Sequence, residues 1–277
     1  MQTNINLYQV PTRDGALCLY ANNEALSADA RRPVLLMIHG ALRDSSVLFD
    51  WIQLCDSECD VVFVDLPGHG RSPAIANVTI ESFAENVGDA VTAVLGNRAV
   101  VVVGESLGGL VALAMSVLDI KSIQGVVAAD PPMTMAKLWH VRNAISSAVA
   151  SNPDNQFWQS LAINIFGVGA DGKSHERIYY DLVQQAHVPV LILTGDVPLF
   201  PVRNVNAVPC LLDDVDRYVL RRFAGDSVQI EVVPGCGHVL LVDAKEKCRS
   251  IIGKFCDALR ASVNKNLASE SGAKTRR

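Results

Sequence analysis

A serine in a tight glycine turn is the residue of this chain best suited to nucleophilic chemistry. Ser106 stands in Gly104-Glu105-Ser106-Leu107-Gly108, directly after the apolar run 99–103. A β-branched run ending in G-x-S-x-G is typical of a nucleophile on a sharp strand-to-helix turn, where larger side chains two positions away would clash. Residues 107–115 are small and apolar and predict a buried helix whose N-terminus points at the serine.

A serine hydroxyl is a poor nucleophile at neutral pH and needs a base within hydrogen-bond reach. His238 is the candidate, in Val233-Pro234-Gly235-Cys236-Gly237-His238. A lone histidine is more often a surface or structural residue. Here a glycine-bracketed loop after the last predicted strand leaves the imidazole free to reach across the sheet edge, which favours a role as base.

The base must be oriented by an acid, and Asp196 is the first candidate. It ends the strand-like run 191–195 and lies between the serine and the histidine in the chain. An aspartate after a glycine is also a common turn residue. Asp130, at the end of the preceding predicted strand, is the main rival candidate, and Asp213 or Asp214 remain open.

Backbone amides near the serine must receive the negative charge that develops on the substrate oxygen. One is expected to be that of Leu107, at the start of the helix. The other is expected from the His39-Gly40 turn after the run 34–38, with Ala41 as the donor and Leu42 in reserve.

The elements that must position these groups alternate along the chain, as in a mostly parallel sheet wrapped by helices. An opening hairpin is predicted first, followed by buried strands and the helices between them. The predicted strands are 5–10, 16–20, 34–38, 61–64, 99–103, 125–129, 188–193 and 228–233, and the predicted helices are 45–54, 80–95, 107–115 and 244–261.

The strand rhythm stops between residues 131 and 187, where aromatic residues concentrate. We interpret 131–187 as a helical cap inserted into an α/β core of residues 1–130 and 188–261, over the carboxyl ends of the strands. Residues 262–277 are polar without an apolar face and predict a disordered tail. Candidate substrate-binding residues are Leu42, Met133, Trp139, Phe157 and Trp158, although packing inside the cap is an equally good interpretation of each aromatic.

Composition narrows the class of protein. The chain has 277 residues, 49% of them hydrophobic, and a net charge of -5, which disfavours nucleic acid as a partner. No apolar run is long enough to span a bilayer and no secretory signal is visible, so we expect a cytoplasmic protein. Seven cysteines without ligand spacing fit reduced thiols. We expect neither a metal nor a cofactor, and the oligomeric state stays open.

Taken together, these motifs resemble the α/β-hydrolase superfamily, in the form of a serine hydrolase with a small helical cap. The similarity runs from Val34 to Leu259 and includes His39-Gly40, the segment 65–72 (Asp-Leu-Pro-Gly-His-Gly-Arg-Ser), the serine turn and Gly237-His238. The resemblance implies a triad of Ser106, Asp196 and His238, and a mainly structural role for the segment that contains His69. Family members usually place the acid three residues after the strand-ending glycine, where this chain has Pro198, and this departure keeps Asp130 open.

A serine at the turn favours acyl transfer to water. We therefore expect hydrolysis of a carboxylic ester-type bond (an ester, lactone or thioester) in a small, largely apolar substrate, since few charges lie between residues 131 and 166. Three further classes could use the same residues: a carbon–carbon bond hydrolase, a lyase or cofactor-free oxygenase, and a ligand receptor with vestigial hydrolase activity.

Overall fold

The computed structural model describes residues 5–22, 24–27, 30–55, 58–169, 171–198, 208–223, 225 and 227–274. Within these residues, eight strands form one sheet in the order β1-β2-β4-β3-β5-β6-β7-β8. The first two pair antiparallel as a hairpin, β2 pairs antiparallel with β4, and all later neighbours are parallel. The strands are β1 (Asn6–Thr12), β2 (Gly15–Ala21), β3 (Val34–Ile38), β4 (Asp60–Val64), β5 (Val100–Glu105), β6 (Ile123–Ala129), β7 (Val190–Gly195) and β8 (Val228–Val233).

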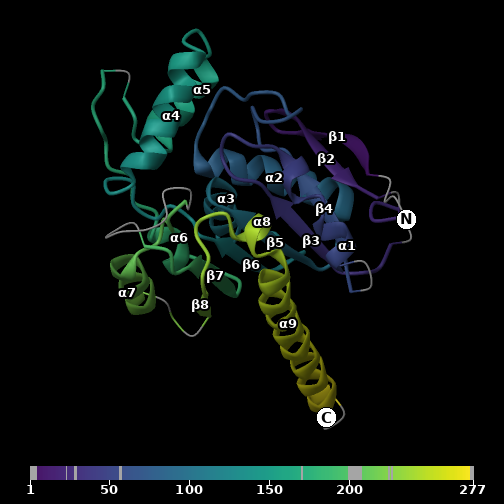
Figure 1. The fold of residues 1–277 in the computed structure, drawn as a ribbon. Coiled ribbons are helices and arrows are strands. Elements are labelled where there is room, and N and C mark those ends of the chain that lie inside the picture. Colours follow the sequence, from purple (N-terminus) through teal and green to yellow (C-terminus); the bar gives the residue numbers. More distant parts are fainter. Residues whose placement is uncertain are drawn as a thin grey trace.

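Helices cover both faces of this sheet, which explains why its central strands are continuous apolar runs. On β3, Leu36 and Ile38 pack into the core shared with helices α2 (Ile80–Leu95) and α3 (Leu107–Met115), while Leu35 and Met37 face α1 (Trp51–Cys55) and α9 (Lys245–Lys274). Helices α6 (Asp181–Gln184) and α7 (Asp214–Phe223) lie on the same side of the sheet as α2 and α3 (Figure 1). The predicted α/β class, a mostly parallel sheet flanked by helices, is confirmed.

Local signals fix several element boundaries. The Thr79 side chain accepts from the amide of Ser82, whose hydroxyl accepts in return from the amide of Thr79, so α2 begins where the sequence predicts. The predicted helix 45–54 is instead a 3₁₀ turn, η1 (Ser45–Leu48), followed by the short α1. The Asp44 side chain caps that turn, because it accepts from the amide of Ser46.

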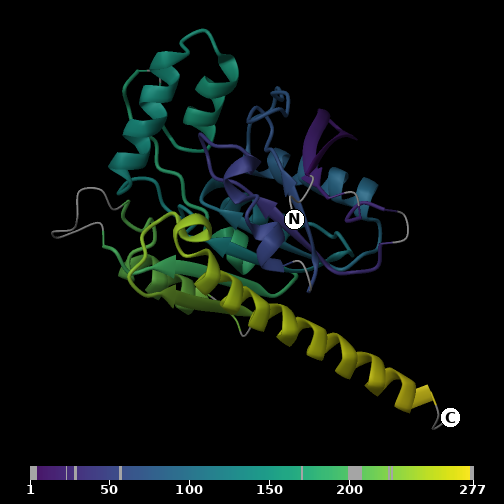
Figure 2. The same ribbon diagram turned by 45° about the vertical axis from the view of Figure 1, so that its right-hand side comes forward.

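Two helices between β6 and β7 stand apart from the sheet layers (Figures 1 and 2). They are α4 (Trp139–Ser151) and α5 (Gln156–Asn164), and they pack on each other. Phe157 of α5 lies over Gly68, in the loop after β4, so this pair of helices sits at the carboxyl edge of the parallel strands. Helix α6 follows α5 in the chain but packs against α3, and its Val183 is buried in the hydrophobic core. It therefore belongs to the core and not to the pair α4 and α5.

The C-terminal helix α9 is longer than the sequence indicates. It leaves the body of the molecule and extends to Lys274 (Figure 2). Residues 262–274, for which a disordered tail is predicted, are therefore helical, and residues 275–277 lie outside the described residues.

Candidate active site

Ser106 occupies a strained turn between β5 and α3. Its backbone has φ 57° and ψ -117°, a conformation that non-glycine residues rarely adopt and that is held here by the surrounding structure. A Cβ on Gly104 would lie 2.0 Å from the carbonyl oxygen of Gly108, and a Cβ on Gly108 would lie 2.5 Å from that of Ile38. The glycines of the motif are thus required by close backbone approach, as the sequence predicts.

The His238 imidazole is bound by a buried carboxylate. Its Nδ1 lies 2.7 Å from Oδ2 of Asp130, which is 0% exposed at the end of β6. When Nδ1 donates its proton to the carboxylate, Nε2 is left as the acceptor, which is the tautomer a general base needs. The loop is held in place by the amide of His238, which donates to the carbonyl of Val208 at 3.0 Å.

Asp130 is surrounded by hydrogen-bond donors besides the imidazole. The amide of Leu211 donates to Oδ2 at 2.7 Å, and the amide of Leu212 donates to Oδ1 at 3.3 Å. The Thr194 hydroxyl donates to Oδ1 at 3.0 Å. With the imidazole, these donors give both oxygens of the fully buried carboxylate hydrogen-bond partners.

This arrangement corrects the expected partner of the base: Asp196 does not contact His238. Asp196 is exposed, and its Oδ1 accepts from the amide of Gly235 at 2.7 Å, so it braces the start of the histidine loop. Asp130 directly follows β6, the strand beside the serine strand, whereas Asp196 directly follows β7, one strand further away. The carboxylates of Asp213 and Asp214 are engaged elsewhere, the first with Lys137 and the second with Arg217.

The turn after β3 lies directly against the serine. A Cβ on Gly40 would be 3.2 Å from the Cβ of Ser106, and Leu42 has a positive φ of 61°. The buried His39 anchors this turn: Nδ1 lies 2.7 Å from the carbonyl of Gly40, and Nε2 accepts from the amide of Leu66 at 3.1 Å. Ala41 therefore belongs to a loop packed on the serine, and α3 begins at Leu107, the residue after that serine.

A buried glutamate links these loops, and sequence reasoning missed it. Glu105 immediately precedes Ser106 and is 2% exposed. Its Oε2 accepts from the amide of Leu241 at 2.8 Å, and its Oε1 lies 3.3 Å from Nη1 of Arg43. The sequence does contain a signal for this buried carboxylate, because Glu105 is an ionisable residue at the end of a predicted strand that is otherwise rich in valine.

The segment 65–72 is structural, as the resemblance implies. Asp65 accepts from the amides of Ser45 and Arg71 at 2.9 and 2.8 Å, which ties η1 to the turn after β4. His69 packs edge-on against Trp158 with ring centroids 5.3 Å apart. Burial lowers the pKa of His69 to about 4, so this ring is neutral at physiological pH.

The candidate substrate-binding residues divide into buried and accessible ones. Met133 and Phe157 are part of the hydrophobic core, and Trp158 is half-buried against His69. Leu42 and Trp139 are 44% and 50% exposed. Trp139 lines a cavity of about 480 Å³ together with Asp196 and Leu212, beside the segment that binds Asp130.

Among the described residues, His, Cys, Asp and Glu side chains do not gather in groups of three or more suited to a metal ion. Within the same residues, every helix is too short or too polar to cross a bilayer.

Comparison with known proteins agrees with the fold. The model of the alpha/beta hydrolase family matches residues 35–249, and the chain belongs to this family. A curated relative, lipase LipV from Mycobacterium tuberculosis, is 34% identical over 125 residues, which cover 43% of this chain and 44% of the lipase. The match thus spans less than half of that relative.

Solved structures of esterases share the whole fold. Carboxylesterase CesB from Bacillus subtilis superposes with a TM-score of 0.65 at 18% identity, covering 92% of both chains. Naproxen esterase from the same organism gives 0.66 at 20% identity, again with 92% of each chain covered. A thermophilic esterase from Thermogutta terrifontis gives 0.64 at 17% identity, covering 92% of this chain and 99% of its own.

Proposed function

We propose that this protein is a serine hydrolase of carboxylic ester-type bonds, with Ser106 as nucleophile, His238 as general base and Asp130 as the acid that orients the base. The observation that carries the proposal is the 2.7 Å hydrogen bond between His238 Nδ1 and the fully buried Asp130. It joins the histidine of the loop after β8 to the residue that follows β6, the strand beside the serine strand, and a proton on Nδ1 leaves Nε2 available as the base.

In the proposed reaction, the Ser106 hydroxyl attacks the ester carbonyl carbon and its proton passes to Nε2 of His238. The tetrahedral intermediate collapses, and the alcohol departs with that proton. The serine oxygen then carries the acyl group. Water then attacks the acyl-enzyme while His238 again accepts the proton, and His238 returns that proton to the Ser106 oxygen as the carboxylic acid is released. Asp130 remains ionised and stabilises the imidazolium formed in each half of the cycle.

The negative oxygen of the intermediate is assigned to the backbone amides of Ala41 and Leu107. Support comes from the contact of Gly40 with Ser106 and from the start of α3 at Leu107, where amides of the first turn have no intrahelical partner. Donors held rigidly in the fold are not reorganised during the reaction, which is why such sites stabilise charge effectively.

The substrate is assigned as a small, largely apolar ester, lactone or thioester that enters beneath the segment 131–187. Helices α4 and α5 of that segment act as a cap in this proposal, since α5 packs over the loop after β4. Of the candidate contacts, Leu42 and Trp139 remain as substrate-binding residues because both are accessible. Met133 and Phe157 hold the cap and the core together.

Hydrolysis of p-nitrophenyl butyrate by Ser106→Ala tests the proposal. We expect kcat to fall by about 10⁴-fold or more, because triad residues act as a unit, and we expect labelling by a fluorophosphonate probe to be lost. Ser116→Ala is the matched control, since Ser116 is a buried serine at the other end of α3. Equal turnover by Ser106→Ala and the parent protein would reject the assignment.

A further inference from the structure

Glu105 is an ionisable side chain in a place where burial is expensive. Moving a carboxylate out of water costs several kcal/mol unless hydrogen bonds or opposite charges compensate. Burial raises the pKa of Glu105, while the charge of His238, the amide of Leu241 and the charge of Arg43 oppose that shift. A hydrophobic residue would avoid the cost, so the carboxylate needs an explanation.

The two partners of this carboxylate come from the two loops that must meet at the serine. Leu241 lies three residues after His238, in the short helix α8 (Leu240–Asp243). Its amide donates to Oε2 of Glu105 at 2.8 Å, and both groups are buried. Arg43 lies two residues after Ala41, and its Nη1 is 3.3 Å from Oε1. One side chain thus fastens the histidine loop and the loop of the proposed oxyanion donor to the residue before the nucleophile.

The histidine loop is also held from behind. The carbonyl of Leu241 accepts from Nε1 of Trp51 at 2.8 Å, so both backbone groups of Leu241 are bound by buried partners. Leu241 is thus bonded on one side to Trp51 and on the other to Glu105, the residue before the nucleophile.

We propose that Glu105 is a positioning residue for the reaction of Ser106 and His238, holding the two loops on the serine turn and placing a second negative charge near the imidazolium. The inference rests on the proposed function. Glu105 transfers no proton. Asp130 binds the imidazole directly, whereas Glu105 binds the amide of Leu241, three residues further along the same loop.

Two conservative variants separate the two parts of this role. Glu105→Gln keeps the length of the side chain and an acceptor for Leu241, and it loses the charge. Glu105→Asp keeps the charge, but it is one methylene too short to span the 2.8 Å contact. The matched control is Asp60→Asn, because Asp60 is also buried and is paired with Arg98 and Arg32 at the opposite edge of the sheet.

The readout is the pH profile of kcat/KM for p-nitrophenyl butyrate, with kcat and KM measured separately. For Glu105→Gln we expect the acidic limb to move to lower pH by roughly 0.5–1 unit, because a unit charge near the imidazolium has been removed. For Glu105→Asp we expect kcat to fall by about 10–100-fold with KM within about threefold and the limb unmoved, because misplacement of reacting groups lowers kcat. Asp60→Asn should lower thermal stability without changing kcat or the position of the acidic limb.

An unmoved acidic limb in Glu105→Gln together with kcat within twofold of the parent would overturn the inference. If Glu105→Gln does not fold by circular dichroism, unchanged kcat in Glu105→Asp overturns it equally. Failure of the proposed function is distinguishable, since Ser106→Ala would then retain hydrolysis whatever Glu105 does.

Discussion

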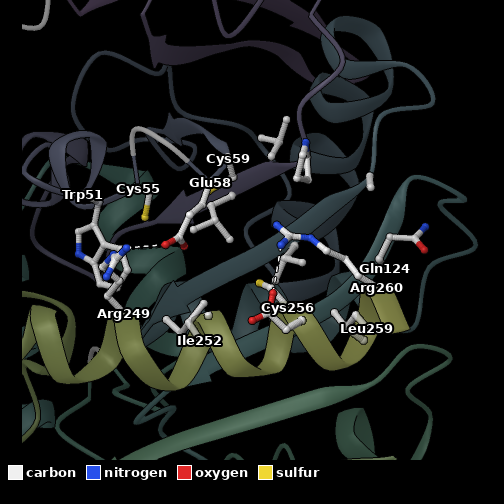
Figure 3. Close-up of a pocket in the computed structure, with 17 residues that line it drawn as sticks. Trp51, Cys55, Glu58, Cys59, Gln124, Arg249, Ile252, Cys256, Leu259 and Arg260 are labelled. Atoms are coloured by element: carbon white, nitrogen blue, oxygen red, sulfur yellow. Dashed lines mark hydrogen bonds and ion pairs between the residues drawn. The ribbon is translucent and has the colours of Figure 1, made fainter. Parts of the chain in front are cut away.

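The two edges of the parallel sheet contrast in what they bury. At the carboxyl edge, Asp130, His39 and Glu105 are all within the interior, and each has hydrogen-bond partners from neighbouring loops. At the amino edge, the first residues of β3 and β5 and the helices α1 and α9 enclose a pocket of about 400 Å³ (Figure 3). The first region buries ionisable side chains, and the second is lined mainly by apolar side chains with charged ones at its rim.

The amino-edge pocket is lined by thiols and by charged side chains that pair with each other. Figure 3 shows Cys55, Cys59 and Cys256 on its walls, and burial raises the pKa of Cys256 to about 11, so that thiol stays protonated. The charged side chains at its rim pair with each other: Arg249 with Glu58 at 2.6 Å and Arg260 with Asp257 at 3.1 Å.

Cavities occur at both edges, so the two edges differ in the side chains that surround the cavities. The amino-edge pocket lies between α1, which has only five residues, and α9. Chemistry arises at the carboxyl edge because loops, each able to present a side chain or amide, converge where parallel strands end. Variants at the two edges should have correspondingly different effects.

The largest effect within this comparison is expected from Asp130→Asn. The amide can no longer accept as a carboxylate from His238 Nδ1, so the productive tautomer and the imidazolium both lose stabilisation. We expect kcat for p-nitrophenyl butyrate to fall by about 10³–10⁴-fold, with little change in KM. Asp196→Asn, which changes an exposed carboxylate on the same edge, should stay within about threefold of the parent. A larger loss in Asp196→Asn than in Asp130→Asn would reverse the assignment of the acid.

The acid also shows where sequence reasoning stops. The strand runs, the capped helix α2, the glycines around Ser106 and the glycine-bracketed His238 are local patterns, and each was predictable from its own neighbours. Choosing between Asp130 and Asp196 required knowing which strand lies beside the serine strand. That adjacency is set by the packing of the whole sheet, so the sequence left both residues open and favoured the one that does not contact the imidazole.

The residues that sequence reasoning missed have the same origin. Glu105 is one residue inside a motif that was identified, but its partners Leu241 and Arg43 are 136 and 62 positions away in the chain. The helical state of residues 262–274 was missed for a different reason. Their polar composition lacks the apolar periodicity on which helix prediction depends.

A smaller effect is expected of pH on the free energy of unfolding, and the groups responsible for it lie at the carboxyl edge. His69 is buried and neutral there, with its pKa lowered to about 4 by burial, whereas an unfolded histidine titrates near 6.5. Between these values the unfolded chain binds more protons than the native protein, so stability is full above about pH 6.5 and falls as the pH drops toward 4. His39, whose pKa is also lowered by burial, adds to the same loss.

His69→Gln tests this contribution, because glutamine does not titrate. The difference in unfolding free energy between pH 7.5 and pH 4.5, measured in urea, should be about 2–3 kcal/mol smaller in the variant than in the parent. Equal pH dependence in the two proteins would show that the neutral, buried state of His69 contributes nothing to acid sensitivity. Replacing Cys256 by Ser at the amino edge should leave this pH dependence unchanged, since its thiol does not titrate in that range.

The smallest effect is expected from replacing a glycine at the amino-edge pocket, and this replacement should stabilise the fold. Gly253 of α9 lines the pocket, and a Cβ placed on it would meet no heavy atom within 4 Å. Gly253→Ala should therefore raise the unfolding free energy by about 1 kcal/mol through helix propensity and leave kcat unchanged. Gly104→Ala makes the same chemical change at the carboxyl edge, where the new Cβ would lie 2.0 Å from the Gly108 carbonyl oxygen. That variant should lose stability and activity together, because the serine turn must move to admit the methyl group. If both alanines had the same effect on unfolding, the open space at Gly253 and the close backbone packing at Gly104 would not differ in the way the structure indicates.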